Sequence, residues 1–298
     1  MTSPITPLVD HIVILIPYSF LSTPPSWFAD LFHFYPGGRH SDGLTENTLV
    51  LLADGSYLEF IAFVPGIDPA KRAAHQWGNK KEGTVVDWAV TLPPPSDHEE
   101  GEEKFLEQEQ KFREVQKKVR EANAGIVYGD LRRGGRTRPD GEVLKWAVAF
   151  PRHDDEAGGD PVKPGTVPFW CLDVTPRNLR VPYTDPGVTK HPIGAVGVAK
   201  IKVTSKDPKT TESAGTIYNV ILDTKKVAGY DGWKIGSPAG EKVHSEGAVY
   251  LGSSDGSARV DIAFFTDNPD LVGKSVGGEV DEGHNLTFHL VAAFSNEE

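Results

Sequence analysis

Two short segments decide the fold of this 298-residue chain: Val9-Asp10-His11-Ile12-Val13 and Val86-Asp87-Trp88-Ala89-Val90. Both are apolar runs around an aspartate, and Trp88 occupies the position of His11 when the letters are aligned. Such runs of β-branched and apolar residues are typical of buried strands. The repetition predicts two related units, of which only the first begins with a potential metal ligand.

Each segment begins the same order of elements, a strand, a helix and about three further strands. In the first unit, at about 1–66, we expect strands at 8–16, 47–53 and 56–64 and a short helix around Trp27. Asp54-Gly55 between the last two strands indicates a hairpin. In the second unit, at about 84–175, we expect the following elements: strands at 84–92, 125–129, 143–150 and 167–174, and a helix at 101–123 whose buried face holds Phe105, Phe112, Val115, Val119 and Ala122. Glu99, Glu100, Glu102 and Glu103 are expected at the solvated start of that helix.

A third, related unit is expected at 194–298, after a proline-rich connector at 176–193 that shows no sign of a site. Its predicted elements are strands at 195–203, 247–252, 258–266 and 285–294 and a helix at 209–222. The first unit's hairpin and last strand are repeated at one constant offset by Ser254-Asp255-Gly256-Ser257 and Ile262-Ala263-Phe264. In this alignment Val260 corresponds to Glu59. The third unit therefore reuses the scaffold without its carboxylate.

Composition limits the classes of function. The net charge of −11 argues against nucleic-acid binding and against binding to anionic membranes, because both reward basic surfaces. The single cysteine, Cys171, excludes a cysteine-cluster metal site. No apolar run is long enough to span a bilayer and no secretory signal is apparent, so a cytoplasmic protein is expected. Many glycines and prolines favour a strand-rich α+β fold.

The chain resembles the glyoxalase-like proteins of the vicinal oxygen chelate superfamily, the glyoxalase/bleomycin resistance/dioxygenase type. The resemblance rests on the following phrases taken in order: Val-Asp-His-Ile-Val at 9–13, Gly-Gly-Arg-His-Ser-Asp-Gly-Leu-Thr-Glu-Asn-Thr at 37–48, Tyr-Leu-Glu-Phe-Ile-Ala at 57–62, Arg-Pro-Asp-Gly at 138–141 with Trp146, Pro-Phe-Trp at 168–170, and His-Pro-Ile-Gly-Ala at 191–195. It implies repeated βαβββ units whose curved mixed sheets pair edge to edge around a cleft, here at 1–175. It also implies a divalent metal that binds two adjacent substrate oxygens and acts as a Lewis acid.

Carried over residue by residue, the resemblance makes His11 and Glu59 the metal ligands of the first unit. In the second unit Trp88 stands where the first-strand histidine would be, and the last strand offers Cys171 or Leu172. The second unit thus lacks the residues that would complete a four-ligand metal centre. The sequence does not distinguish Zn, Fe, Mn and Ni as the metal, and a protein without any metal is the alternative. His11 is alternatively a buried strand histidine with both ring nitrogens satisfied.

Five residues besides His11 and Glu59 are candidates for the cleft. His40 either completes the metal shell or orients a substrate, which with Glu59 makes it a catalytic candidate. Arg136 and Arg138, from a cluster of four arginines around Gly134-Gly135, are expected to clamp a carboxylate or another oxyanion; the alternative is an exposed hairpin edge. Trp88 and Trp146 either belong to the core or form an aromatic wall that suits an apolar ligand.

The leading function is a small-molecule enzyme with lyase, isomerase or ring-opening chemistry on a substrate with adjacent oxygens. The alternative is a metal-free protein that sequesters a small molecule in an aromatic-lined cleft. A third is a scaffold without a working site that is retained for dimerisation. The expected partner is a small molecule, with a homodimer as one expected assembly and neither nucleic acid nor membrane involved.

Overall fold

The two repeated segments pair with each other at the centre of the molecule. In the computed structural model, which describes residues 6–93, 101–138, 140–155, 159–226, 232–253, 258–281 and 283–294, they form β1 (Leu8–Leu15) and β5 (Thr84–Thr91). The strands run antiparallel, with His11 opposite Ala89 and Val13 opposite Asp87. This pairing joins the first two units edge to edge, as predicted.

Around this pair the chain builds an eight-stranded sheet in the order β2-β3-β4-β1-β5-β10-β8-β7. Its other strands are β2 (Tyr35–Arg39), β3 (Thr45–Leu51), β4 (Tyr57–Phe63), β7 (Arg132–Thr137), β8 (Val143–Ala149) and β10 (Phe169–Asp173). On each side the last strand of a unit lies parallel to its first strand. The Asp54-Gly55 hairpin between β3 and β4 is confirmed, and Gly55 takes the positive φ of 83° that this turn requires. The predicted α+β class with curved, repeated units is also confirmed.

The two outer strands of this sheet, β2 and β7, curl round and meet. His40, just after β2, forms an isolated antiparallel bridge with Arg136 of β7, and the Ser41 amide donates to the Gly135 carbonyl at 3.1 Å. We call this junction the seam. Neither edge strand was predicted, because their glycines and proline are typical of loops. In the structure the glycines allow close approach: a Cβ on Gly37 would lie 2.1 Å from the Asn47 carbonyl oxygen.

A second sheet has seven strands in the order β12-β13-β14-β11-β15-β17-β16. They are β11 (Ala195–Ser205), β12 (Asp223–Lys226), β13 (Gly232–Ile235), β14 (Gly247–Ser253), β15 (Arg259–Thr266), β16 (Ser275–Asp281) and β17 (His284–Ala292). The remaining pair, β6 (Ile126–Tyr128) and β9 (Pro151–His153), forms a small ribbon. The division of the chain at 1–175 and 194–298 stays a prediction.

The topology of the second sheet corrects the predicted equivalence of β15 with β4. β15 pairs antiparallel with β11, in the way that β5 pairs with β1, and β14 lies parallel to β11 in the way that β4 lies parallel to β1. Val260 of β15 is therefore not the counterpart of Glu59. The predicted turn at 254–257, like Glu99 and Glu100, lies outside the described residues.

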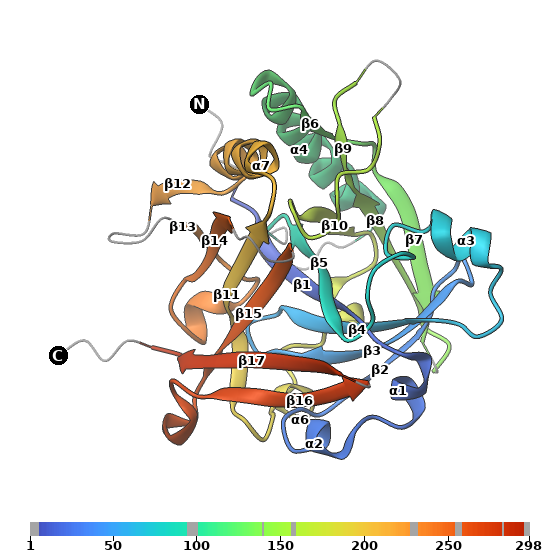
Figure 1. Cartoon of the computed structure of the whole chain (residues 1–298), viewed down its shortest axis with the longest axis vertical. Helices are drawn as coiled ribbons and strands as arrows, with labels where there is room; N and C mark the ends of the chain where they lie inside the picture. The colour runs from blue at the N-terminus through green and yellow to red at the C-terminus, as the bar shows by residue number, and fades with distance from the viewer. Residues whose placement is uncertain are drawn as a thin grey trace.

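The longer helices cover the sheets from one side. They are α4 (Glu102–Glu121) and α7 (Pro208–Ile221), which lie against each other in Figure 1. The shorter helices are α1 (Tyr18–Ser22), α2 (Ser26–Ala29), α3 (Pro69–Ala74), α5 (Arg177–Arg180) and α6 (Pro186–Thr189), with single 3₁₀ turns at Gly240–Lys242 and Pro269–Leu271. Four of the five residues predicted for the buried face of α4 are buried, with Gln108 beside them and Ala122 at the helix end. Among the described residues, no helix has the length and apolarity needed to cross a membrane.

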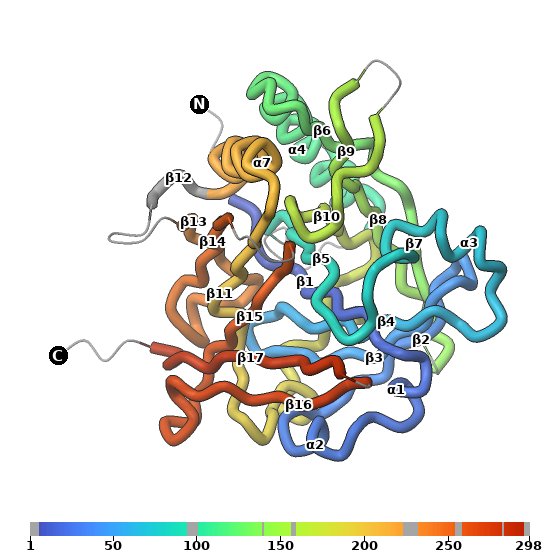
Figure 2. The backbone as a smooth tube through the Cα atoms, in the orientation of Figure 1, coloured from blue at the N-terminus to red at the C-terminus, as the bar shows by residue number. Residues whose placement is uncertain are grey.

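The eight-stranded sheet has two different faces. Its outer face carries Ile12, Phe60, Trp88 and Trp170 into a large core shared with Phe264 and its neighbours on the second sheet. The inner face carries a smaller cluster that includes Phe169. The trace in Figure 2 shows the two sheets side by side. The inner face, which carries the smaller cluster, surrounds a cavity.

The contact between the two sheets also includes a buried polar link. Asp54, in the β3–β4 turn, lies 3.1 Å from Nε2 of His244 and accepts a hydrogen bond from the Val198 amide at 3.3 Å. The His244 ring stacks on Phe265 with centroids 4.2 Å apart. Because a buried carboxylate requires partners, these contacts fix the second sheet against the first hairpin.

Candidate functional site

The inner face of the eight-stranded sheet encloses a cavity of about 300 Å³. Five of the predicted site residues line it: His11, His40, Glu59, Arg136 and Trp146. They come from strands of both units and from the seam, and the fold therefore brings together residues that lie far apart in the sequence. Their catalytic and binding roles remain predictions.

Glu59 lies in the middle of β4 and is the acidic centre of this cavity. Its two carboxylate oxygens face different histidines: Oε2 lies 3.6 Å from Nε2 of His11, and Oε1 lies 3.4 Å from Nε2 of His40. Asn47 donates to Oε1 at 2.6 Å. Burial alone would raise the pKa of Glu59, but the hydrogen bond and charge of His40, the charge of His11 and the Asn47 bond outweigh it and lower the pKa to about 2. The side chain is therefore an ionised carboxylate at neutral pH.

The orientation of His11 is set by its neighbour in the chain. Asp10 Oδ1 lies 2.5 Å from Nδ1 of His11, and the imidazole ring stacks on Tyr57 with centroids 4.7 Å apart. Asp10 falls at an irregularity of the β1–β5 register, between Val9 and His11, where a bulge lets consecutive side chains serve one site. With Nδ1 bonded to the carboxylate, Nε2 is the nitrogen that faces Glu59.

Asp10 is in turn held by two arginines of α5. Nη1 of Arg177 lies 2.6 Å from Oδ2, and Nη1 of Arg180 lies 3.0 Å from Oδ1. Arg180 also donates to the Tyr57 hydroxyl at 2.7 Å, and both arginines contact Asp173. Burial alone would raise the pKa of Asp10, but the charges of Arg180 and Arg177 and the His11 bond hold it well below its usual value.

This network corrects the expectation that the connector is empty of site residues, because Arg180 itself lines the cavity. One signal was present in the sequence: Asp10 lies within an apolar strand and therefore required a buried cation. The spacing of Arg177 and Arg180 places two cations on one helical turn. What the sequence does not reveal is that the connector folds back over β1.

His40 and Arg136 stand on opposite sides of the seam. Nδ1 of His40 lies 2.7 Å from the Thr45 hydroxyl. Arg136 is only 4% exposed, and its two terminal nitrogens have no hydrogen-bond partner among the described residues. Burial lowers the pKa of Arg136, although Tyr57 and Glu59 act in the opposite direction. Arg136 is thus a buried cation at the cavity wall, and its covered terminal nitrogens have no counter-ion among the described residues.

The second unit supplies a mainly apolar wall. Trp146 of β8 lines the cavity edge-on to His40, with centroids 6.0 Å apart. Phe150 and Phe169 stack with centroids 4.7 Å apart, and Cys171 lies on the same strand face. Leu172, which was predicted as the alternative to Cys171 at the ligand position of the last strand, points into the outer core instead.

Two predicted binding residues lie elsewhere, and their placement at the cleft was wrong. Trp88 is fully buried in the outer core, edge-on to Tyr218 of α7, because it follows Asp87 on an alternating strand. Arg138 donates to the Leu179 carbonyl at 3.0 Å and pairs with Asp140, outside the cavity.

The register of β1 and β5 shows why the letters misaligned Trp88 with His11. Ile12 lies opposite Trp88 in the paired strands. A local two-fold axis through this pair exchanges the two neighbouring pairs, which are His11 with Ala89 and Val13 with Asp87. The structural counterpart of His11 is therefore Asp87. Each strand has one register shift, near Asp10 in β1 and near Val86 in β5, and the same two-fold exchanges these two positions. The letters of the two phrases therefore align one position away from the structural equivalence of the strands.

Asp87 does not open onto the cavity as His11 does. Trp77 donates its indole N–H to Asp87 at 3.0 Å, and the Gly165 and Trp88 amides donate at 2.9 and 3.0 Å. Burial raises the pKa of Asp87 to about 6, with these hydrogen bonds acting in the opposite direction. The indole of Trp77 covers the carboxyl group and itself lines the cavity.

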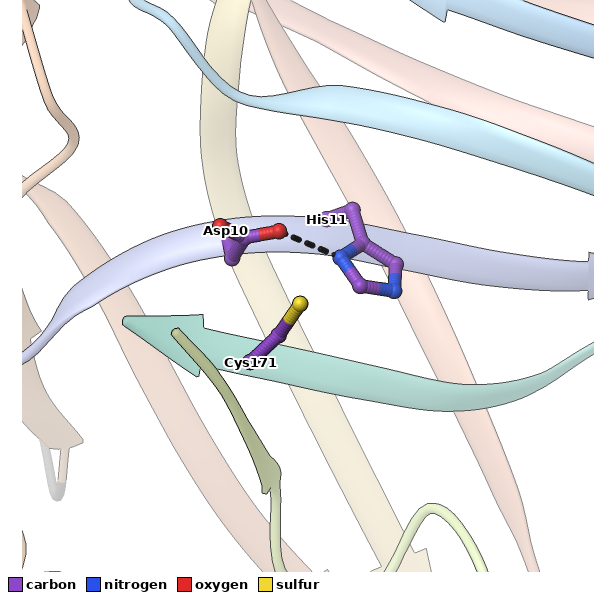
Figure 3. Close-up of side chains that lie close together, drawn as sticks. All are labelled: Asp10, His11 and Cys171. Carbon is purple, nitrogen blue, oxygen red and sulfur yellow. Dashed lines mark hydrogen bonds and ion pairs between the residues drawn. The ribbon is translucent and has the colours of Figure 1, made fainter. Parts of the chain in front are cut away.

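Two sets of side chains can be tested as a metal centre. Asp10, His11 and Cys171 each place a potential ligand atom within 4.8 Å of the others, and Figure 3 shows them converging. This set fits a cation poorly, because Asp10 is neutralised by two arginines and burial raises the pKa of the Cys171 thiol well above its usual value. Nε2 of His11 and Oε2 of Glu59 fit better. Their 3.6 Å separation matches the roughly 3.4 Å between neighbouring ligands at tetrahedral zinc distances, and Asp10 supports the histidine from behind.

Comparison with known proteins agrees with this architecture. A family described as "Glyoxalase-like domain" matches residues 9–217. A hypothetical protein from Staphylococcus aureus has a similar structure, with a TM-score of 0.62 and 14% identity over 95% of this chain and 99% of that one. Methylmalonyl-CoA epimerase from Mycobacterium tuberculosis is matched with a TM-score of 0.33 and 11% identity, over 60% of this chain and 95% of the epimerase. No curated protein matches the chain. The family match spans most of the chain, which therefore belongs to the family of glyoxalase-like domains.

Proposed function

We propose that this chain is an enzyme that acts on a small molecule with two adjacent oxygen atoms, by lyase, isomerase or ring-opening chemistry. The observation that carries the proposal is the position of Glu59, whose two oxygens face Nε2 of His11 and Nε2 of His40 at the wall of a cavity. Two imidazoles and one ionised carboxylate suffice for metal ligation and proton transfer in the same cavity.

In this proposal His11 and Glu59 hold one divalent ion. Their two atoms leave the remaining coordination positions to water and substrate, which an enzymatic site requires. A bound ion of this kind supplies a Lewis acid that stabilises negative charge on substrate oxygens. Asp10 keeps Nε2 of His11 available for ligation, and Arg177 and Arg180 keep Asp10 ionised.

The proton-transfer role goes to His40 rather than to Glu59. A carboxyl group with a pKa of about 2 is a weak base at neutral pH, whereas histidine is the side chain that enzymes use most often for proton transfer. The Thr45 hydroxyl holds Nδ1 of His40 at 2.7 Å, which directs Nε2 toward Glu59 and the cavity. Glu59 and Asn47 then fix the position of the histidine without exchanging the proton themselves.

The alternative function is a metal-free protein that sequesters a small apolar or aromatic molecule. It is favoured by the apolar wall of Trp146, Phe150 and Phe169, which provides stacking surface independent of any ion. Both functions use a small-molecule ligand and neither requires nucleic acid or a membrane.

Metal analysis of the protein purified without chelators tests the enzyme proposal. We expect about one divalent ion per chain, lost in His11→Ala and in Glu59→Ala but kept in His289→Ala, whose histidine is exposed on β17. A protein without metal, and without uptake of Zn²⁺, Mn²⁺, Fe²⁺ or Ni²⁺ on titration, would contradict it. If aromatic ligands still quench the tryptophan fluorescence of such a metal-free protein, the result supports the binding function instead of the enzymatic one.

A further inference from the structure

Most cations around the cavity are already neutralised. Arg180 contacts Asp10 and Asp173 at 2.9 and 2.6 Å, and the exposed Arg133 pairs with Glu102. Arg136 differs from both, because its terminal nitrogens have no partner among the described residues although the side chain is 4% exposed. An unpaired buried cation is costly, so its retention indicates that an anion from outside the chain completes it.

The chain's own carboxylate in the cavity does not fill this role. Glu59 is engaged by Asn47 at 2.6 Å and faces both histidines, and neither terminal nitrogen of Arg136 bonds to it. The two free nitrogens belong to one planar guanidinium, which matches the two oxygens of a carboxylate. A phosphate dianion would bring a second charge, and Glu59 lies close enough to influence Arg136 electrostatically and would repel it.

The rest of the cavity describes the body of the ligand. Trp146, Phe150 and Phe169 present aromatic faces and edges, and the volume of about 300 Å³ is at the lower end for small-molecule sites. Such a wall suits a single aromatic ring or a branched aliphatic chain better than a sugar or a nucleotide.

We propose that the ligand of this cavity is a small monocarboxylate with an aromatic or branched aliphatic body, whose carboxylate binds Arg136 in a bidentate manner when the guanidinium turns toward the cavity. This inference deepens the proposed function, since it names the substrate class of the same cavity. The body then lies along the apolar wall, and the atoms next to the carboxylate face His11, Glu59 and His40.

Calorimetric titration with matched pairs of probes tests the proposal. Each pair consists of a carboxylate and its neutral amide: phenylglyoxylate, phenylacetate and 4-methylpentanoate with their amides. At least one carboxylate is expected to bind ten-fold or more tightly than its amide, which corresponds to about 1.4 kcal/mol. Absence of such a preference in all three pairs would overturn the proposal.

Three variants locate the preference. Arg136→Met is expected to abolish it, Arg136→Lys to retain part of it, and Arg132→Met, an exposed arginine on the same strand, to leave it intact. Arg136→Met is also expected to unfold at the same or a higher temperature, since it removes an unpaired buried charge; this shows that lost binding is not lost folding. A carboxylate preference that survives in Arg136→Met would overturn the assignment.

The outcomes separate this inference from the proposed function. A carboxylate preference that persists in His11→Ala and Glu59→Ala, in a protein that binds no metal, supports the inference and rejects the enzyme. Stoichiometric metal without any carboxylate preference supports the enzyme and rejects the inference.

Discussion

The two halves of the eight-stranded sheet share a backbone plan but differ in chemistry. In the first half, His11 and Glu59 face the cavity with polar partners behind them. In the second half, Asp87 occupies the position of His11 and is covered by Trp77, and the facing strand brings Phe169 and Cys171. The difference shows that the two halves keep one strand arrangement, whereas the histidine and the carboxylate proposed to hold a metal both come from the first half.

The largest expected effect comes from breaking the support of the first half. Asp10→Ala removes one of the two counter-ions of Arg177 and Arg180, which are 8% and 3% exposed, and leaves only Asp173 beside them. We expect a loss of about 3–5 kcal/mol in the free energy of unfolding. Urea denaturation measures it. Asp261→Ala, which breaks an exposed pair with Arg259, is the control and should cost about 0–1 kcal/mol. Equal losses in the two variants would show that the buried network does not stabilise the first half.

The second effect depends on pH and concerns the equivalent residue of the second half. Because the pKa of Asp87 is raised from 3.8 to about 6 in the fold, ionising it destabilises the folded state. The wild type should therefore lose about 2–2.5 kcal/mol relative to Asp87→Asn as the pH rises from about 4 to 7, with most of the loss before pH 6.

Unfolding curves of both proteins at several pH values measure this difference. Only its change with pH is diagnostic, since the asparagine also weakens the bond from Trp77. A stability difference that stays constant from pH 4 to pH 7 would mean that Asp87 titrates normally, like an exposed carboxylate.

A smaller effect sharpens the role of Trp77 as the cover of Asp87. Trp77→Phe keeps most of the apolar contact but removes the indole N–H that Asp87 accepts, and a loss of about 1–2 kcal/mol is expected at neutral pH. The loss should shrink at pH 5, where a larger share of Asp87 is protonated and needs the donor less. Chemical denaturation at both pH values measures it, and a loss that grows on acidification would contradict this role.

The sequence predicts the parts of this molecule that follow local patterns. β1, β4, β5 and α4 come from continuous apolar runs or helical periodicity, and the β3–β4 hairpin comes from Asp54-Gly55. The edge strands β2 and β7 could not be predicted in this way, because their glycines serve a close approach that exists only in the folded sheet.

The same division applies to the site. His11, Glu59 and Arg136 are conspicuous in the sequence, since each is a charged or titratable residue in an unusual setting. Arg177 and Arg180 are not, because their role depends on the connector folding back over Asp10. The pairing of Trp88 with His11 failed for another reason: the shared Val-Asp letters align one position away from the equivalence that the pairing of β1 with β5 establishes.

The seam links the assembly of the site to the closure of the sheet. His40 and Arg136 lie on its two sides, so neither residue reaches the cavity until segments from two different units have met. Contacts between such distant segments are among the slowest to form during folding. A shift of either edge strand by one residue would turn its side chain from the interior to the solvent. Amide hydrogen exchange at Ser41, whose N–H bonds across the seam to Gly135, therefore reports directly on whether the binding cavity exists.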